Sequence, residues 1–217
     1  MINIPLFPLN TVLFPGMPLT LHIFEERYKL MIAECLRQET PFGVVLIDEG
    51  QEALGPLAKP HTVGCTARIT RMEPLDGGRM NINSIGEKRF VIQELSNEGT
   101  FLTAAIEFQS IRTTDPDNAD RMVAQFMPFL ARYLDILAQI GQIEFDPSKI
   151  PTDPKELAYI SAYLVQTSPT TKQDLLASNT TEELFDRLRE VFRKETALIR
   201  AMSSHTGNDS SQVFSKN

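Results

Sequence analysis

Prolines interrupt the apolar runs with which this chain begins. Pro5 and Pro8 stand within residues 4–9, and Pro15 follows the apolar residues 12–14. Proline has no N–H to donate to a β-ladder, so in sheets it is confined to edges, strand starts and bends. The opening segment is therefore predicted to run in short extended pieces with fixed corners.

Residues 1–112 have the pattern of a mainly β region. Leu19, Leu21 and Ile23 alternate with polar residues, as in a half-buried strand. Asp76-Gly77-Gly78 predicts a tight hairpin, because glycine tolerates the positive φ angles of such turns. Further strands are expected at residues 42–47, 63–70, 80–85, 89–95 and 101–108. Short strands separated by turns predict a small barrel-like sheet.

One helix is expected inside this β region, from Phe24 until Pro41 stops it. Glu25 and Glu26 suit its first turn, where the helix dipole is positive, and this role is preferred to acid–base catalysis because adjacent helical residues do not face each other. Arg27 is expected to tie the helix to the sheet. The apolar face that should pack on the sheet comprises Phe24, Tyr28, Met31, Ile32, Cys35 and Leu36.

Helical patterns dominate after a boundary near residues 113–117. One helix face runs from Met122 to Leu137, with a kink expected at Pro128 and an end at Gly141. Asp153 and Thr180 have the sequence context of helix N-caps, and a short helix is expected at 172–177. The predicted organisation is a β subdomain at 1–112, a helical bundle at 116–202 and a disordered polar tail at 203–217.

The amino-acid composition limits which cellular compartment and which partners are expected for this chain. The 217 residues carry two cysteines and a net charge of −7, divided evenly between the two halves of the chain. Two cysteines are too few for a disulfide framework, so a reduced cytoplasmic location is expected. No apolar run reaches the roughly 18–20 residues that span a bilayer, so no membrane association is expected. The acidic balance argues against a nucleic-acid partner, although Arg68, Arg71, Lys88 and Arg89 could form a local basic patch.

Short motifs along the whole chain carry a family resemblance. They are Leu6-Phe7-Pro8-Leu9, Phe14-Pro15-Gly16, Ile23-Phe24-Glu25 with Arg27-Tyr28, Gly64, Gly78-Arg79, Gly86 with Arg89-Phe90, Lys172-Gln173-Asp174-Leu175-Leu176 and Arg187-Leu188. In this order and spacing, residues 2–202 resemble a stand-alone N-terminal substrate-binding domain of Lon proteases. The resemblance implies an α+β fold, in which a PUA-like β pseudo-barrel precedes a helical bundle. It also implies recognition of unfolded or tagged protein segments.

Catalytic motifs are not found in the sequence. The Gly86–Arg89 segment lacks the spacing and the hydroxyl of a phosphate-binding Walker A loop, and the serine–lysine pair of Lon lies beyond the region of resemblance. His61 and Cys65 have a metal-binding spacing only on a helix, but their surroundings predict a strand. No enzyme activity, metal or cofactor is therefore expected.

Two places are candidates for binding a protein segment. Phe14 and Met17 belong to a proline-rich loop and could supply adaptable apolar contacts, although a role for Phe14 as a plug of the barrel is preferred. The second candidate is the crevice between the barrel and the helical bundle. The leading hypothesis is a non-catalytic protein-binding module that acts as an adaptor in protein quality control. An RNA-binding module of PUA-like type is the alternative, and an enzyme of unknown type comes third; the sequence does not set the oligomeric state.

Overall fold

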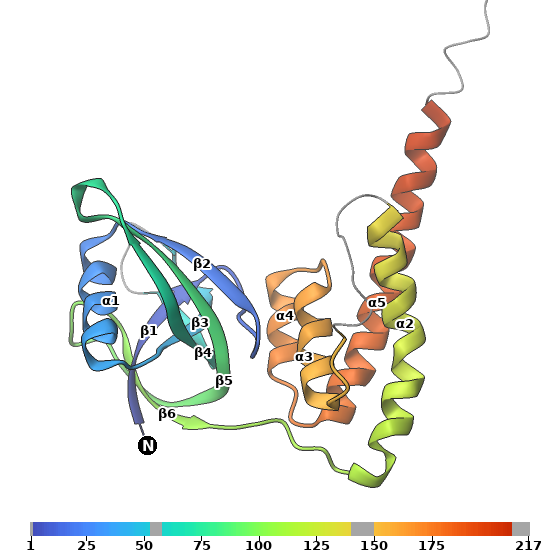
Figure 1. Cartoon of the computed structure of the whole chain (residues 1–217), viewed down its shortest axis with the longest axis horizontal. Coiled ribbons are helices and arrows are strands. Elements are labelled where there is room, and N and C mark those ends of the chain that lie inside the picture. The colour runs from blue at the N-terminus through green and yellow to red at the C-terminus, as the bar shows by residue number, and fades with distance from the viewer. Residues whose placement is uncertain (1, 53–57, 140–149, 210–217) are drawn as a thin grey trace, which may run out of the picture. The chain divides into compact units, whose positions relative to one another are not determined.

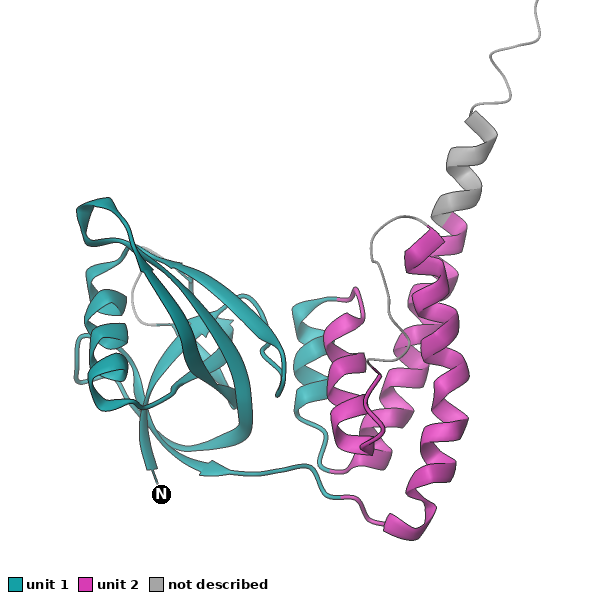
Figure 2. Cartoon of the chain, in the orientation of Figure 1, with its two compact units in different colours: residues 1–112, 168–179 teal, residues 113–167, 180–217 magenta. Residues whose placement is uncertain are grey.

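The computed structural model (Figure 1) describes residues 2–52, 58–139 and 150–209, with the backbone alone for 202–209. Its contacts divide the chain into two compact units (Figure 2). The first comprises Met1–Arg112 and Ser168–Asn179, and the second comprises Thr113–Thr167 and Thr180–Asn217. Residues 168–179 thus pack with the sheet, whereas the sequence grouped them with the other helices.

The first unit is built on one six-stranded sheet with the strand order β2-β5-β4-β3-β1-β6. Because β6 also pairs with β5, the strands β5, β4, β3, β1 and β6 close into a ring, and β2 extends from it. This is the barrel-like sheet expected from the short strands and turns. The strands are β1 (Ile2–Leu9), β2 (Pro18–Ile23), β3 (Phe42–Glu49), β4 (Lys59–Pro74), β5 (Met80–Ser96) and β6 (Thr103–Phe108).

Both prolines of β1 lie inside a single strand, so the expected corners at Pro5 and Pro8 are wrong. The strand changes partner between them: Ile2–Pro5 pairs with β6, and Leu6–Leu9 pairs with β3. Leu6 N–H donates to Leu102 on the β6 side, and successive residues point their backbone groups to opposite sides. Pro5 therefore faces β3 before that pairing begins, and Pro8 faces β6 after that pairing has ended. Neither proline removes a ladder hydrogen bond.

β5 is one continuous strand, whereas the sequence predicted two strands separated at Gly86. Its first half pairs with β2 and its second half with β6, while β4 runs along its other side. Gly86 lies between the two halves, where a Cβ atom would come within 2.2 Å of the Phe14 carbonyl oxygen. The absence of a side chain at Gly86 therefore lets the segment before β2 pack against β5 without interrupting it.

The helix α1 (Glu26–Gln38) packs on the sheet of the first unit (Figure 1). Four residues of the predicted apolar face are buried in the main apolar cluster, namely Tyr28, Met31, Ile32 and Cys35. The other two, Phe24 and Leu36, are exposed. Phe24 precedes the first helical turn, so the helical periodicity from which its burial was predicted does not apply to it.

The second unit contains α2 (Ala119–Gln139), α3 (Pro154–Leu164) and α5 (Thr181–Asp209). The aromatic side chains of α2 and α5 form its centre, with Phe126 against Phe185, and Tyr133 against Phe192. Asp153 caps α3 and Thr180 caps α5, as the sequence predicted. Pro128 lies inside α2, and Gly141 lies outside the described residues. The backbone of α5 continues past Ser203, where the tail was expected to begin.

Candidate functional site

The proline-rich loop before β2 is fastened to β5 at Gly86. Gly16 N–H donates to the Gly86 carbonyl (2.8 Å), and Gly86 N–H donates to the Met17 carbonyl (2.9 Å). Phe14 has an exposed fraction of 0%, and Met17 packs partly buried against the main apolar cluster. Phe14 therefore has no surface to offer a ligand and serves as a core side chain, the alternative weighed above. Met17 can offer a ligand only part of its side chain, because it is partly buried.

The loop leads directly into β2, which has one free edge. Among the described residues β2 pairs only with β5. The bond from Gly86 to Met17 makes these two a hydrogen-bonded pair, and such pairs alternate along an antiparallel ladder. The N–H and C=O groups of Thr20 and His22 consequently lie on the edge away from β5. A strand edge with unpaired donors and acceptors is a template for another extended chain.

The side chains of β2 hold this edge strand in register. Thr20 Oγ1 donates to Asn83 Oδ1 (3.0 Å), and His22 Nδ1 lies 2.8 Å from Asn81 Oδ1. Both pairs lie directly across the β2–β5 ladder. β2 is therefore supported through its side chains on β5, while no other described strand pairs with its outer backbone groups.

A small hollow opens at the C-terminal end of β2, with a volume of about 140 Å³. Phe24, at 44% exposure, stands at this hollow with its ring stacked on His22 (6.0 Å between centroids). The volume suits one apolar side chain rather than a drug-sized ligand, whose pockets hold at least roughly 300 Å³. The residues that line it are Phe7, Leu9, Thr20, Leu21, His22, Ile23, Phe24, Glu25, Tyr28 and Glu52.

The charges around the hollow are paired within the protein. Arg27 and Glu25 form an ion pair of 3.0 Å, and the Arg27 guanidinium lies 4.7 Å from the centre of the Tyr28 ring. The carboxylate partner of Arg27 is thus Glu25, the N-cap residue of α1. Glu52 accepts from the Asn10 N–H (2.8 Å), and burial raises the pKa of the Tyr28 hydroxyl. Arg27, Glu25 and Glu52 beside the hollow are therefore each engaged by a group of the protein itself.

A larger groove, of about 760 Å³, lies elsewhere in the first unit between β1, β6 and the end of α1. Exposed Ile2 and Phe108 contribute to it, together with Ile4, Pro41 and Phe101. Its acidic lining residues are Glu34 and Glu94. It is a second apolar surface, but the β1 edge beside it contains Pro5 and so offers fewer backbone donors than β2.

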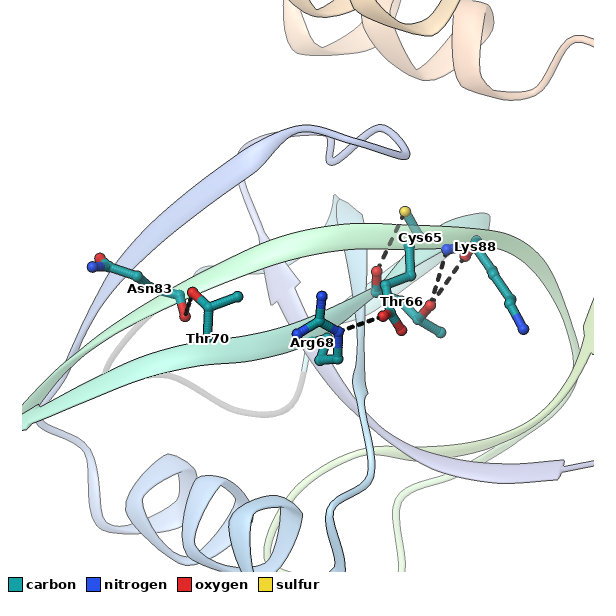
Figure 3. Close-up of polar contacts among 7 residues, drawn as sticks. Cys65, Thr66, Arg68, Thr70, Asn83 and Lys88 are labelled. Atoms are coloured by element: carbon teal, nitrogen blue, oxygen red, sulfur yellow. Dashed lines mark hydrogen bonds and ion pairs between the residues drawn. The ribbon is translucent and has the colours of Figure 1, made fainter. Parts of the chain in front are cut away.

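An ion pair between side chains of β4 and β5 neutralises part of the basic patch that the sequence allowed (Figure 3). Arg68 Nε donates to Glu87 Oε1 at 2.6 Å on the exposed side of the two strands. Arg89 is buried, with an exposed fraction of 4%, and donates to the carbonyls of Leu176 and Ala177. Arg68 is thus paired with a carboxylate and Arg89 is buried, which weakens the case for nucleic-acid binding.

Cys65 is fully buried on β4, while His61 lies partly exposed with Nε2 3.8 Å from Asp48 Oδ1. Both belong to a strand, so their spacing does not bring them to one helical face. Within residues 2–52, 58–139 and 150–201, no group of three His, Cys, Asp or Glu side chains could hold a metal ion. None of the helices described there is long and apolar enough to cross a membrane.

The free edge of β2 was not predicted from the sequence, although one pattern pointed to it. Pro18 opens β2, and a proline at the start of a short strand is typical of a sheet edge. Nothing local could have revealed Phe24 as exposed, because the sequence places it in register with the buried helical face. The crevice predicted between barrel and bundle stays a prediction.

Comparison with known proteins identifies relatives for nearly the whole chain. The family model of the ATP-dependent protease La (LON) substrate-binding domain matches residues 3–194. The Lon protease of Parabacteroides distasonis is 26% identical over 210 residues, covering 93% of this chain and 25% of that protein. The Lon protease of Anaeromyxobacter dehalogenans is 24% identical, covering 97% of this chain and 26% of its own length. The chain thus spans about a quarter of the length of these relatives.

Two solved structures have the same fold. The crystal structure of a Lon N-terminal domain protein from Xanthomonas campestris matches with a TM-score of 0.63 and 20% identity, over 87% of this chain and 97% of that one. The N-terminal domain of the Mycobacterium avium complex Lon protease matches with a TM-score of 0.66 and 19% identity, over 88% and 98%. These likenesses confirm the predicted α+β architecture of a β pseudo-barrel and helices.

Proposed function

The chain belongs to the LON substrate-binding domain family, and on that premise we propose that it binds extended segments of protein without catalysing a reaction. The partners are unfolded or tagged protein segments, and the role is that of an adaptor in protein quality control. The chemistry of the β2 edge supports binding of polypeptide rather than of RNA, since backbone amides are its free groups. We place this activity in the cytoplasm, where the two free cysteines would stay reduced.

The free edge of β2 is the observation that carries the proposal. An incoming segment in extended conformation pairs with the outward N–H and C=O groups of Thr20 and His22, and adds one strand to the sheet. Main-chain hydrogen bonds of this kind do not depend on the sequence of the ligand. Such an edge therefore suits a module that must accept many unfolded chains.

Phe24 and the hollow beside it supply the apolar contribution. One apolar side chain of the segment enters the hollow of about 140 Å³ and contacts the exposed Phe24 ring. Aromatic residues at the centre of an interface often contribute about 2 kcal/mol or more to binding. The segment is thus expected to need an extended backbone and at least one apolar side chain.

Nucleophilic catalysis by the two thiols is not part of the proposal. Burial raises the pKa of the Cys35 thiol to about 11 and raises the pKa of the Cys65 thiol still further. The thiolate is the reactive form, so neither thiol is activated near neutral pH. We propose that the chain presents segments to a partner rather than altering them.

Anisotropy measurements with a fluorescent, reduced and alkylated unfolded protein test this function, with the same protein in its folded state as the reference. Binding of the unfolded form alone is expected. A peptide array then identifies a binding peptide, which is resynthesised with N-methyl groups at alternate residues; one of the two methylation registers should abolish strand pairing and binding.

Two variants locate the site. Phe24→Ala is expected to weaken binding about tenfold, which corresponds to about 1.4 kcal/mol. Leu198→Ala in the second unit, at a residue of similar exposure, should leave binding unchanged. Equal binding of folded and unfolded protein would overturn the function, and indifference to both N-methylation and Phe24→Ala would overturn the assignment to β2.

A further inference from the structure

Arginines line a groove between α2 and α5 in the second unit, and this groove belongs to neither surface described above. The hollow has a volume of about 350 Å³ and is lined by Phe129, Arg132, Phe192, Arg193, Thr196, Ala197 and Arg200. Its base is aromatic, since Phe192 is buried and Phe129 is partly buried. All three arginines are exposed along it.

The arginines are placed there by helical spacing. Arg193, Thr196, Ala197 and Arg200 stand at i, i+3, i+4 and i+7 of α5, so they share one face of that helix. Arg193 and Arg200 are therefore about 10 Å apart along the helix axis. Arg132 of α2 lines the same hollow from the opposite helix.

These charges are not neutralised by the protein as far as the described residues show. No Asp or Glu lines the hollow, and none of its three guanidiniums lies within salt-bridge distance of a described carboxylate. Arg193 instead lies 5.1 Å from the centre of the Phe129 ring, a cation–π contact. Arg189, four residues before Arg193, does pair with Asp186, so α5 is not lacking in carboxylates near its arginines.

An adjoining hollow of about 500 Å³ shares Arg132 and Arg200 and extends this surface along α2. Its acidic lining residue is Asp135, and Ile136 and Ile199 supply apolar contacts. The two hollows thus share two arginines, and apolar side chains contribute to the lining of both. This concentration of positive charge stands out in a chain of net charge −7.

We propose that this arginine groove binds an acidic segment of a partner protein. Guanidinium groups bind carboxylates through paired hydrogen bonds, and they do so more strongly where an apolar base excludes water. Two carboxylates three residues apart in a polyproline II segment lie on the same face and are separated by about 9 Å, which is close to the roughly 10 Å between Arg193 and Arg200 along α5. An apolar residue between them would contact Phe129 and Ala197.

A polyanion such as RNA is disfavoured by the same charge distribution. Nucleic-acid binding needs an extended field of positive charge, whereas this chain is acidic over both halves of its sequence. A short acidic peptide can occupy three arginines locally without approaching the acidic remainder. The acidic segment is therefore the occupant that the observations favour.

Anisotropy with a labelled twelve-residue peptide tests the inference on the full chain. The peptide carries two glutamates three residues apart around a leucine; a second peptide replaces both glutamates with lysine, and a single-stranded oligonucleotide serves as the polyanion. Binding of the glutamate peptide, at least tenfold tighter than that of the lysine peptide and weakened by added salt, is expected. Equal binding of both peptides, no binding, or tighter binding of the oligonucleotide would overturn the proposal.

Matched variants separate this groove from the β2 edge. The double variant Arg193→Gln/Arg200→Gln should weaken binding of the glutamate peptide at least tenfold, whereas Arg121→Gln, an exposed position of α2 outside the groove, should not. Circular dichroism checks that the variants keep their helices. Phe24→Ala should leave binding of the acidic peptide intact, so a failure of the proposed binding to the β2 edge would not affect this result. If the double variant bound the glutamate peptide as tightly as the parent protein, the assignment to this groove would be overturned.

Discussion

Arg89 Nε donates a hydrogen bond of 2.7 Å to the carbonyl oxygen of Leu176, 87 residues further along the chain. The same guanidinium donates to the Ala177 and Gln109 carbonyls, so a buried cation satisfies the C-terminal end of α4 (Pro169–Leu176). A positive charge at a helix C-terminus is favourable because the carbonyls there carry partial negative charge. Gln173 adds a second link, donating to the Val63 carbonyl on β4 (3.0 Å). These contacts join α4 to the sheet.

Replacing Arg89 with methionine should therefore loosen α4 from the sheet. Hydrogen bonds from charged groups contribute roughly 1.5–3 kcal/mol each, and the loss leaves several buried carbonyls unpaired, so a decrease of about 3 kcal/mol in the free energy of unfolding is expected. Urea denaturation measures this decrease. Hydrogen exchange of the α4 amides should accelerate before that of β4.

Arg68→Met is the control for this change, because Arg68 forms an exposed pair with Glu87, and such pairs contribute about 0–1 kcal/mol. If the two methionine variants were equally stable, the attachment of α4 through Arg89 would be contradicted.

Gly86→Ala should disturb the junction between β5 and the segment before β2. The added Cβ would meet the Phe14 carbonyl oxygen at 2.2 Å, a contact with backbone that cannot move aside cheaply. Overpacking of this kind costs typically about 1–3 kcal/mol. Thermal unfolding should show a lower midpoint, and binding of unfolded segments should weaken because β2 begins at this junction. Gly99→Ala, where the nearest atom lies 3.6 Å away, should behave like the parent protein.

Thr66→Val tests how β4 and β5 accommodate a bulge. The ladder shifts by one residue between Cys65 and Ala67, and the buried Thr66 hydroxyl accepts from Lys88 N–H (3.1 Å) and lies 3.4 Å from the Lys88 carbonyl (Figure 3). Valine keeps the shape but leaves these groups unpaired, so a loss of about 1–3 kcal/mol is expected in urea unfolding. The exposed Thr62→Val on the same strand should change stability by no more than about 0.5 kcal/mol. If Thr66→Val left the free energy of unfolding unchanged, the Thr66 hydroxyl would be dispensable for stability.

The raised pKa values of the two buried thiols predict that the folded state loses stability at alkaline pH. Burial raises the pKa of Cys35 to about 11 and raises that of Cys65 as well, whereas an unfolded thiol has a pKa of about 8.5. The folded state therefore holds these protons more tightly, and their contribution to stability is complete below about pH 8.5 and declines as the pH rises toward 11. Urea midpoints between pH 7 and 10.5 measure the decline. Its slope should diminish in Cys35→Ala/Cys65→Ala, and an identical slope in that variant would assign the effect to other groups.

Local sequence chemistry determined the elements of this fold. Alternation located β2, and a short continuous apolar run located β3. The Asp76-Gly77-Gly78 triplet located the hairpin, and the caps at Asp153 and Thr180 located two helix starts, because each of these patterns acts within a few residues. The motifs of the family were also legible in the sequence. The order of the elements and the fold class followed from them.

Tertiary structure alone decided which side chains are available for binding. Phe14 is buried and Phe24 is exposed, although both are aromatic residues within apolar motifs. Arg89 enters the protein because α4 presents its carbonyls there, and β2 keeps a free edge because the ring closes between β5 and β6. Each of these outcomes depends on contacts between residues far apart in the chain, and local periodicity carries no information about such contacts.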